Sequence, residues 1–326
     1  TTVYAGSDGN LLADCAENCR VLQINNPVLS SRDLMKIEGL HMPGLQAKKV
    51  SLLYYKNSSL ALALDRLFVA CDKAYYAGAN ILILSDRGVD ENHIAIPSLL
   101  AVSAVQQYLV RTKKRTAISM ILESAEPRDV HHFATLFGYG ASAVNPYLAQ
   151  DCIGELIAEG ALNKDYYAAI DAYNKAVLDG VVRIASKMGI SSMQSYEGAQ
   201  IFEAVGICRQ VVDTYFTNTV SRVGGIGLEE INEAVVWRHD RAFDPMDLTV
   251  ELTVDSSGFH KLRSGVDMED HMYNPLTILT LQKAVQTGDF ACFRRYSAMV
   301  DDEHVPHTLR GLLGFRFDEE KAIPLE

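Results

Sequence analysis

Residues 81–88 read ILILSDRG, four apolar residues in a row followed directly by a polar turn. An uninterrupted apolar strand has to be covered on both of its faces, which is typical of a parallel sheet that lies between other layers. The turn carries Asp86 and Arg87 at the point where this strand would end. We therefore predict a central parallel strand with two charged side chains at its carboxyl end.

The same pattern of a strand followed by a helix occurs before and after this stretch. Each apolar run is followed by a segment in which apolar residues recur every three or four positions, as on the buried face of a helix. Successive units of this kind form a parallel α/β sheet with right-handed crossovers, either an open sheet or part of a barrel. Strands are expected at residues 50–55, 81–84, 117–122 and 143–144, and helices are expected from Leu60 (with Ser59 as N-cap), Pro97 and Pro127.

Two further segments precede and follow these units. Residues 1–45 mix short polar and apolar pieces with turn signals such as Asn-Asn-Pro, which predicts an irregular N-terminal arm. A long helix is expected over residues 164–188, because apolar residues there are spaced by three and four. Gly180 lies inside it at a cost of about 1 kcal/mol relative to alanine, which indicates a close packing contact or a kink.

The character of the chain changes beyond residue 230. Residues 237–247 and 255–270 are charged and irregular, and only residues 275–287 and 290–300 have a helical pattern. We therefore expect one α/β domain over residues 1–230. Residues 231–326 are expected to form a connecting C-terminal extension with few core contacts of its own.

Composition narrows the functional class. The 326 residues include 48% hydrophobic and 22% charged residues, which predicts a folded, soluble protein. The net charge of −11, without a local basic stripe, argues against a nucleic-acid surface. No apolar run is long enough for a membrane span, and the N-terminus resembles no signal peptide but begins as if cut from a longer protein. Six sparse cysteines favour a reduced, cytoplasmic setting.

The predicted strand ends carry the candidate functional residues. In a parallel α/β sheet, the loops that follow the strands meet on one edge, and functional side chains gather there. In one interpretation, Asp86 and Glu123 form a general acid/base pair whose pKa values are separated by burial. In the other, Asp86 caps a turn and Glu126 caps the helix that starts at Pro127. The strand-end residues are Asp86, Arg87, Glu123, Ser124 and Asn145.

Other possible sites carry weaker signals. His131 and His132 are adjacent on a helix and point about 100° apart, so they are poorly placed to share a metal ion. Cys15 and Cys19 lack the spacing and the second pair of a structural zinc site. The glycine-rich segment 221–227 could hold a phosphate, but it matches no nucleotide-binding motif, and a turn before the next helix is the favoured interpretation. We expect no metal site.

Several motifs together resemble one family. The resemblance is to the central domain of the large subunit of glutamate synthase, over most of residues 1–230 in order. It continues more weakly toward the connection that enters the flavin domain of that enzyme. The motifs lie at residues 78–81, 85–88, 130–133, 138–140, 143–148, 186–191, 194–196, 198–203, 221–226, 296–297 and 309–313.

The resemblance implies a function for the whole polypeptide. Glutamate synthases hydrolyse glutamine, pass the ammonia through an internal tunnel and add it to 2-oxoglutarate, with FMN and an iron–sulfur cluster. Residues 1–326 contain no flavin-barrel sequence and no cluster-binding cysteine group, so we expect no cofactor in this fragment. The implied partners are the glutaminase and FMN domains of the same polypeptide, with a reductase subunit or ferredoxin as the electron donor. Glu197 stands where the family usually has a basic residue.

Two functional interpretations follow. The favoured one is a non-catalytic central domain whose strand-end face lines part of the tunnel. Its side chains would be fixed by mutual hydrogen bonds, with Asp86 bound to Arg87 and Glu123 bound to Ser124. The alternative is a self-contained, barrel-like lyase or hydrolase that uses Asp86, Glu123 and Asn145.

Overall fold

The computed structural model describes residues 1–243 except 8, 10, 11, 14 and 41, together with 271–301, 309–314, 316 and 323. Residues 255–270, which were predicted to be irregular, lie outside the described residues. The chain divides into two compact units, residues 1–248 and residues 249–326. Each unit is described by itself below.

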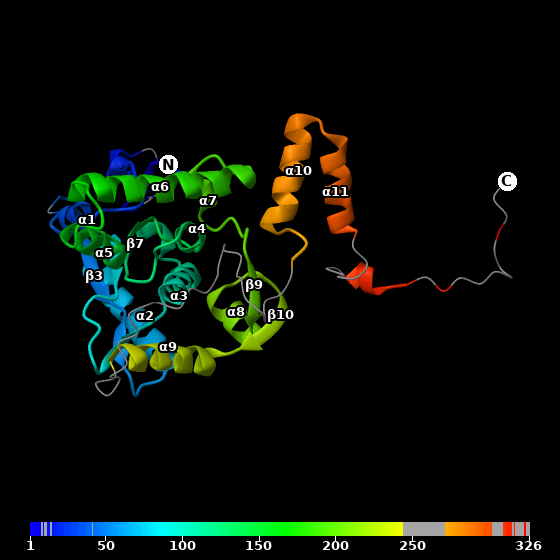
Figure 1. Ribbon diagram of the computed structural model, residues 1–326. Coiled ribbons are helices and arrows are strands. Elements are labelled where there is room, and N and C mark those ends of the chain that lie inside the picture. Colours follow the sequence, from blue (N-terminus) through cyan, green and yellow to red (C-terminus); the bar gives the residue numbers. More distant parts are fainter. Residues whose placement is uncertain are drawn as a thin grey trace. The chain divides into compact units, whose positions relative to one another are not determined.

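The first unit is built on a parallel four-stranded sheet. Its strands lie in the spatial order β3-β5-β7-β8, and each neighbouring pair is parallel. Helices α2, α3 and α4 follow one another along one side of the sheet (Figure 1). The predicted α/β class is therefore confirmed, and the sheet is open rather than closed into a barrel. The elements are β3 (Ala47–Ser51), α2 (Leu60–Tyr76), β5 (Ile81–Ser85), α3 (Ser98–Arg111), β7 (Ser119–Glu123), α4 (Val130–Gly138) and β8 (Ala143–Asn145).

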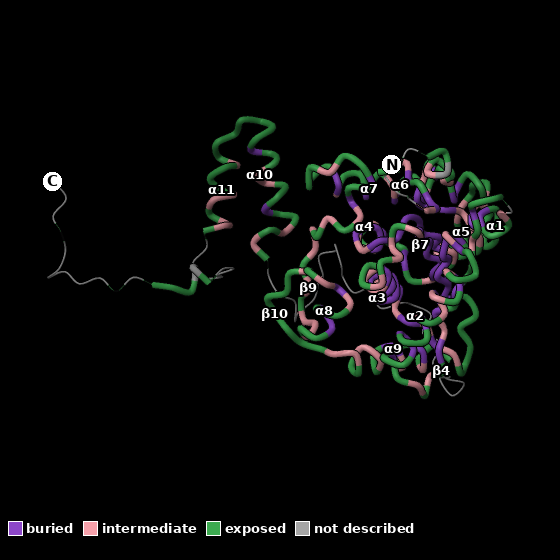
Figure 2. The backbone as a smooth tube through the Cα atoms, turned by 180° about the vertical axis from the view of Figure 1, so that it is seen from behind, coloured by how far each residue is buried: buried purple, intermediate pink, exposed green. Residues whose placement is uncertain are grey.

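The N-terminal arm contributes to the same core. Every residue of β5 and β7 is buried, as the apolar run at residues 81–84 predicted. Figure 2 shows the buried residues concentrated around β7, α3 and α4. Val28 forms a parallel bridge with Val144 of β8, and Ser119 Oγ of β7 donates to Gly6 O at 2.9 Å. The arm contains β1 (Val3–Ala5), a 3-10 helix (Ala16–Cys19), β2 (Leu22–Ile24) and α1 (Ser31–Glu38).

Two local predictions at the starts of helices have different outcomes. Ser59 caps α2 as predicted, because its side chain accepts a hydrogen bond from Leu62 N. The helix expected from Pro127 instead begins at Val130, since Asp129 is the residue that caps it. Glu126 accepts a hydrogen bond from Ser98 N at 2.7 Å, so it satisfies the start of α3 and not of α4.

Three other predictions were wrong, two of them because of how strands pair. The strand expected over residues 50–55 is two strands, because β4 pairs antiparallel with β6 while β3 pairs with β5. The turn expected at 221–227 is β10, which pairs parallel with β9. The irregular segment expected from 237 is helical as far as Phe243, because α9 continues through it. These elements are β4 (Leu53–Tyr55), β6 (His93–Ala95), β9 (Glu203–Ile207), β10 (Val220–Ile226) and α9 (Leu228–Phe243).

The remaining elements of the first unit are mostly helical. The long helix predicted over residues 164–188 is α6, which packs against α4 and α5. These elements are a 3-10 helix (Arg115–Ala117), α5 (Tyr147–Ala158), α6 (Tyr166–Lys187), α7 (Met193–Tyr196) and α8 (Arg209–Tyr215).

The second unit contains a helical hairpin. Its helices are α10 (Pro275–Thr287) and α11 (Phe290–Val300), with the boundaries that the sequence predicted. Asn274 forms a capping box at the start of α10, and Gly288 takes a left-handed conformation at its end. The two helices pack on each other, and a 3-10 helix (Leu309–Leu312) follows.

Gly180 provides a test of the packing between α6 and α4. A Cβ atom at this position would lie 2.5 Å from Cγ2 of Val130, so the close contact expected from the sequence is present. We predict that Gly180→Ala destabilises the fold by about 1–3 kcal/mol through overpacking, although alanine favours helices elsewhere. Urea unfolding should show partial rescue in the Gly180→Ala/Val130→Ala double variant, and a stabilising single variant would contradict this packing.

Candidate functional site

The strand ends form a polar row across the sheet. Ser51, Ser85, Glu123 and Asn145 are paired in register from one strand to the next. Each of the four is the last residue of its strand. Paired residues in neighbouring strands point to the same face, so these four side chains share one end and one face of the sheet.

Glu123 is the charged centre of this row. It is 3% exposed, and its carboxylate accepts hydrogen bonds from Ser85 Oγ at 2.6 Å and Arg87 Nε at 2.5 Å. Lys49 Nζ lies 2.9 Å from Glu123 Oε2 and 2.5 Å from Glu38 Oε1. The carboxylate therefore joins strands β3, β5 and β7 through ionic and polar contacts.

The environment of Glu123 favours its ionised form. Burial alone would raise the pKa of this carboxyl group, but the hydrogen bonds from Ser85, Lys49 and Arg87, with the charge of Lys49, lower its pKa below the ordinary value. Burial alone would lower the pKa of Lys49, but its contacts with the carboxylates of Glu38 and Glu123 raise this pKa above the ordinary value. Both groups are therefore held in their charged forms at neutral pH.

Asp86 forms a second cluster beside the first. It is 4% exposed and accepts hydrogen bonds from Ser124 Oγ at 2.6 Å and Ala125 N at 3.0 Å, and it is also hydrogen-bonded to the side chain of Tyr147. Burial raises the pKa of Asp86 in spite of these donors. The Arg87 guanidinium lies 3.8 Å above the Tyr147 ring and so connects the two clusters.

The structure brings the predicted residues together with exchanged partners. Ser124 donates to Asp86, and Arg87 donates to Glu123, so the expected pairs Asp86–Arg87 and Glu123–Ser124 were wrong. Asp86 and Ser124 directly follow the paired ends of β5 and β7, and Asp86 N donates to Glu123 O, so the two loops lie side by side and exchange partners. Asp86 also caps the turn after β7 rather than the turn in which it lies.

Asn145 lies at the end of the row, near the N-terminal arm. It is fully buried, and its Nδ2 donates to Leu29 O at 3.0 Å. Its Oδ1 is buried and has no hydrogen-bond donor among the described residues. Gln150 Nε2 donates to the same Leu29 carbonyl at 2.9 Å, so one oxygen of the arm holds two side chains from the β8 region.

Sequence analysis missed three participants in this site. Ser85 was part of the quoted turn, Lys49 lies two residues before the end of β3, and Tyr147 lies within the motif 143–148, two residues after the end of β8. Each could have been found only from the strand register, which places residues of different strands at one level. Glu197, where a basic residue was expected, forms an ion pair with Arg115 at 3.1 Å.

Other kinds of site are absent from the described part of the chain. No three His, Cys, Asp or Glu side chains there lie close enough to hold a metal ion. Within the same ranges, no helix combines the length and apolar character that a membrane span requires. Residues 221–226 belong to strand β10, all of whose residues are exposed.

Comparison with known proteins identifies the class of this α/β domain. A family model described as the glutamate synthase central domain matches residues 1–208. The chain belongs to this family, as the resemblance predicted.

The relatives share one enzyme name. The large chain of NADPH-dependent glutamate synthase from Bacillus subtilis is 42% identical over 328 residues, covering 100% of this chain and 21% of that protein. The NADH-dependent glutamate synthase of Schizosaccharomyces pombe is 34% identical, with coverage of 99% and 16%. A ferredoxin-dependent glutamate synthase of Synechocystis is 36% identical, with coverage of 99% and 22%. The chain therefore spans about a fifth of the length of these relatives, and its residues 1–208 match the central domain of this family. The alternative of a lyase or hydrolase receives no support.

The Glu123 cluster predicts a pH-dependent contribution to stability. Glu123→Gln removes the charge that Lys49 and Arg87 share, and we expect it to lower the free energy of unfolding by about 2 kcal/mol at neutral pH. Because the folded pKa is lowered, this contribution is complete above about pH 4.5, the ordinary value, and is lost as pH falls through the folded pKa. Urea unfolding from pH 7 to pH 3 measures it.

The exposed ion pair between Arg209 and Asp213 supplies the control. Asp213→Asn should change the unfolding free energy by less than about 0.5 kcal/mol, since exposed pairs are screened by water. A difference between wild type and Glu123→Gln that grows on acidification would contradict the assignment of Glu123 as an ionised, stabilising group.

Proposed function

We propose that this chain is a non-catalytic central domain that joins the glutaminase and FMN parts of one synthase polypeptide. We further propose that its strand-end face, formed by Asp86, Arg87, Glu123, Ser124 and Asn145, is part of the wall along which ammonia passes between them. The whole polypeptide would then form glutamate from glutamine and 2-oxoglutarate, in the assimilation of ammonia.

The oxygens of both carboxylates are occupied by donors of the protein itself, which supports a wall rather than a catalytic centre. Glu123 accepts from three side chains, and Asp86 accepts from a hydroxyl group, an amide and a phenol. Groups that are held in this way keep a surface closed to bulk water, which a passage for a reactive intermediate requires. They are poorly placed to exchange a proton with a substrate, because their oxygens already face donors of the protein.

The side-chain oxygen of Asn145 is suited to accept a hydrogen bond from a small neutral molecule. Its Oδ1 is a buried acceptor with no donor among the described residues, and a buried acceptor without a partner is costly. Ammonia is a small neutral molecule that can donate a hydrogen bond to such an oxygen. This acceptor, at the paired ends of β7 and β8, is the observation that carries the tunnel proposal.

The proposal also assigns the other parts of the chain. Residues 1–230 form the central domain, and residues 231–326 lead toward the FMN part. FMN and the iron–sulfur cluster belong to the rest of the polypeptide, and a reductase subunit or ferredoxin supplies electrons, in line with relatives named for NADPH, NADH and ferredoxin. The six cysteines are free in the structure and suit the reduced cytoplasm.

The first test concerns the fragment alone. Purified residues 1–326 should be colourless and should form no glutamate from glutamine and 2-oxoglutarate, because both reaction centres would lie elsewhere. Absorption spectroscopy and a glutamate assay measure these properties. A near-stoichiometric content of bound FMN would contradict the proposed division of labour.

The second test concerns coupling in the full-length synthase. Asp86→Asn replaces a carboxylate oxygen that faces Ser124, Ala125 and Tyr147 with an amide donor, so the strand-end wall should loosen. We expect glutamine hydrolysis to continue and synthesis from added ammonium to be retained. Glutamate formed per glutamine hydrolysed should fall, and free ammonia should accumulate.

Asp72 offers a matched control for this substitution. It is a partly buried carboxylate that also accepts from a tyrosine, Tyr108 Oη at 2.8 Å, but it lies on α2 away from the strand ends. Asp72→Asn should leave the coupling unchanged. Unchanged coupling in Asp86→Asn, or an equal loss in Asp72→Asn, would rule out the tunnel role of Asp86.

A further inference from the structure

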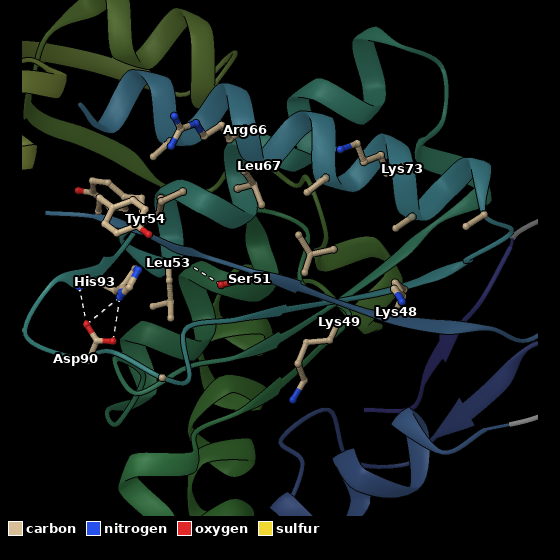
Figure 3. Close-up of a pocket in the computed structure, with 18 residues that line it drawn as sticks. Lys48, Lys49, Ser51, Leu53, Tyr54, Arg66, Leu67, Lys73, Asp90 and His93 are labelled. Atoms are coloured by element: carbon tan, nitrogen blue, oxygen red, sulfur yellow. Dashed lines mark hydrogen bonds and ion pairs between the residues drawn. The ribbon is translucent and has the colours of Figure 1, made fainter. Parts of the chain in front are cut away.

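A groove of about 780 Å³ lies between strand β3 and helix α2, and Lys49 and Ser51 of the strand-end site are among the residues that line it (Figure 3). The helix borders it mainly with short side chains, which leave the space open along the strand. Tyr54 and His93 lie at one end of the groove, and Lys48 lies toward the other end. The short side chains are Ala63, Ala70, Ala74 and Ala77.

Strand β3 presents an unused backbone edge at this groove. Among the described residues, it is the end strand of the four-stranded sheet and has β5 as its neighbour on one side. Gln46 O accepts from Ile81 N, and Leu52 N donates to Ser85 O, so the even-numbered residues bond to β5. In a parallel ladder the bonding residues alternate, and the amide and carbonyl groups of Ala47, Lys49 and Ser51 therefore face outward. An open edge of this kind is a template for a further strand.

The groove carries positive charge that the chain itself does not neutralise. Lys48, Arg66 and Lys73 are exposed, and none of the three has an ion-pair partner in the part of the chain that the structure describes. Asp90 is the acidic residue that lines the groove, and its carboxylate is already bonded to His93 at 2.9 Å. This concentration of cations lies on a chain whose net charge is −11. An anionic occupant would complement it.

We propose that this groove receives an extended, acidic segment of the same synthase polypeptide, from outside residues 1–326, which adds to β3 as a further strand. Backbone hydrogen bonds to the outward groups of β3 provide affinity, and carboxylates of the segment pair with Lys48, Arg66 and Lys73. The relatives contain about four-fifths of their length beyond the matched region, which is ample to supply it. The inference rests on the proposed function only in placing this chain within such a polypeptide.

A second copy of the chain is a poorer occupant. Pairing β3 with β3 of another copy would bring Lys48 and Lys49 of one chain close to the same residues of the other. Like charges placed opposite each other on paired strands are destabilising. Lysines on an edge strand also commonly prevent a further strand from pairing with it. An edge of β3 that stays free in the full-length protein is therefore the outcome that opposes the proposal.

Carbodiimide cross-linking of the full-length synthase identifies the occupant. This zero-length reagent joins lysine amines only to carboxylates in contact with them, and mass spectrometry locates both ends. We expect Lys48 and Lys73 to be linked to Asp or Glu residues outside 1–326. Mixing copies with natural and heavy nitrogen shows whether both ends come from one polypeptide. Links only within 1–326, or only between copies, would overturn the proposal.

The variant Ala47→Pro tests the strand addition itself. Ala47 is the first residue of β3, and its amide faces outward, so proline there leaves the β3–β5 ladder intact. In the full-length synthase we expect the amides of Lys49 and Ser51 to exchange at least about tenfold faster in the variant than in the wild type. The amide of Val50, which faces β5, should stay protected and so report that the sheet is folded. Fast exchange of Lys49 and Ser51 in the wild type would overturn the proposal.

Charge variants provide the matched comparison. Arg66→Gln/Lys73→Gln keeps the helix-forming character of α2 but removes two cations of the groove. It should raise exchange at Lys49 in the same direction as Ala47→Pro, whereas Lys175→Gln, on an exposed position of α6, should not. If Arg66→Gln/Lys73→Gln and Lys175→Gln changed the exchange rate of the Lys49 amide equally, the role of groove charge would be overturned. These tests measure cross-links and amide exchange and not enzymatic activity. A failure of the strand-addition proposal is therefore distinguishable from a failure of the proposed ammonia passage.

Discussion

The burial of β5 and β7 on both faces is the constraint on which the rest of the structure depends. All five residues of β5 and all five of β7 are buried, so each face of these parallel strands must be covered by a further layer of structure. The crossover helices provide one layer, since each helix links consecutive strands along the same side. The N-terminal arm, despite its irregular sequence, contributes its apolar residues to the same core. Removing the arm would therefore expose strands that have no polar face to offer to water.

The same constraint explains the chemistry of the strand ends. A carboxylate at the end of a buried strand cannot be left without partners, because an unpaired charge in that environment costs several kcal/mol. Glu123 is therefore surrounded by Ser85, Arg87 and Lys49, which come from its neighbours in the sheet and the loop beyond. The cluster fixes the relative positions of three strands. It also leaves Asn145 Oδ1 as the acceptor in this row for which no donor is described.

The two edges of the sheet are treated differently. The β8 edge is closed by the arm, since Leu29 N and Pro27 O bond to Val144. The β3 edge is bordered by alanines and cations and carries no further strand among the described residues. A domain within a longer polypeptide can leave one edge available, because another part of the chain is always present at high effective concentration. The asymmetry is therefore consistent with a domain that is completed by its neighbours.

The sequence by itself determined the elements whose signals are local. The apolar run at 81–84, the cap at Ser59 and the boundaries of α10 and α11 follow from residues close together in the chain, and so does the placement of Asp86 and Glu123 at strand ends. Only the tertiary structure decided which groups pair. The division of residues 50–55 into two strands and the contact of Lys49 with Glu123 depend on register between distant segments. Local periodicity carries no information about register, because a strand keeps the same pattern whichever neighbour it joins.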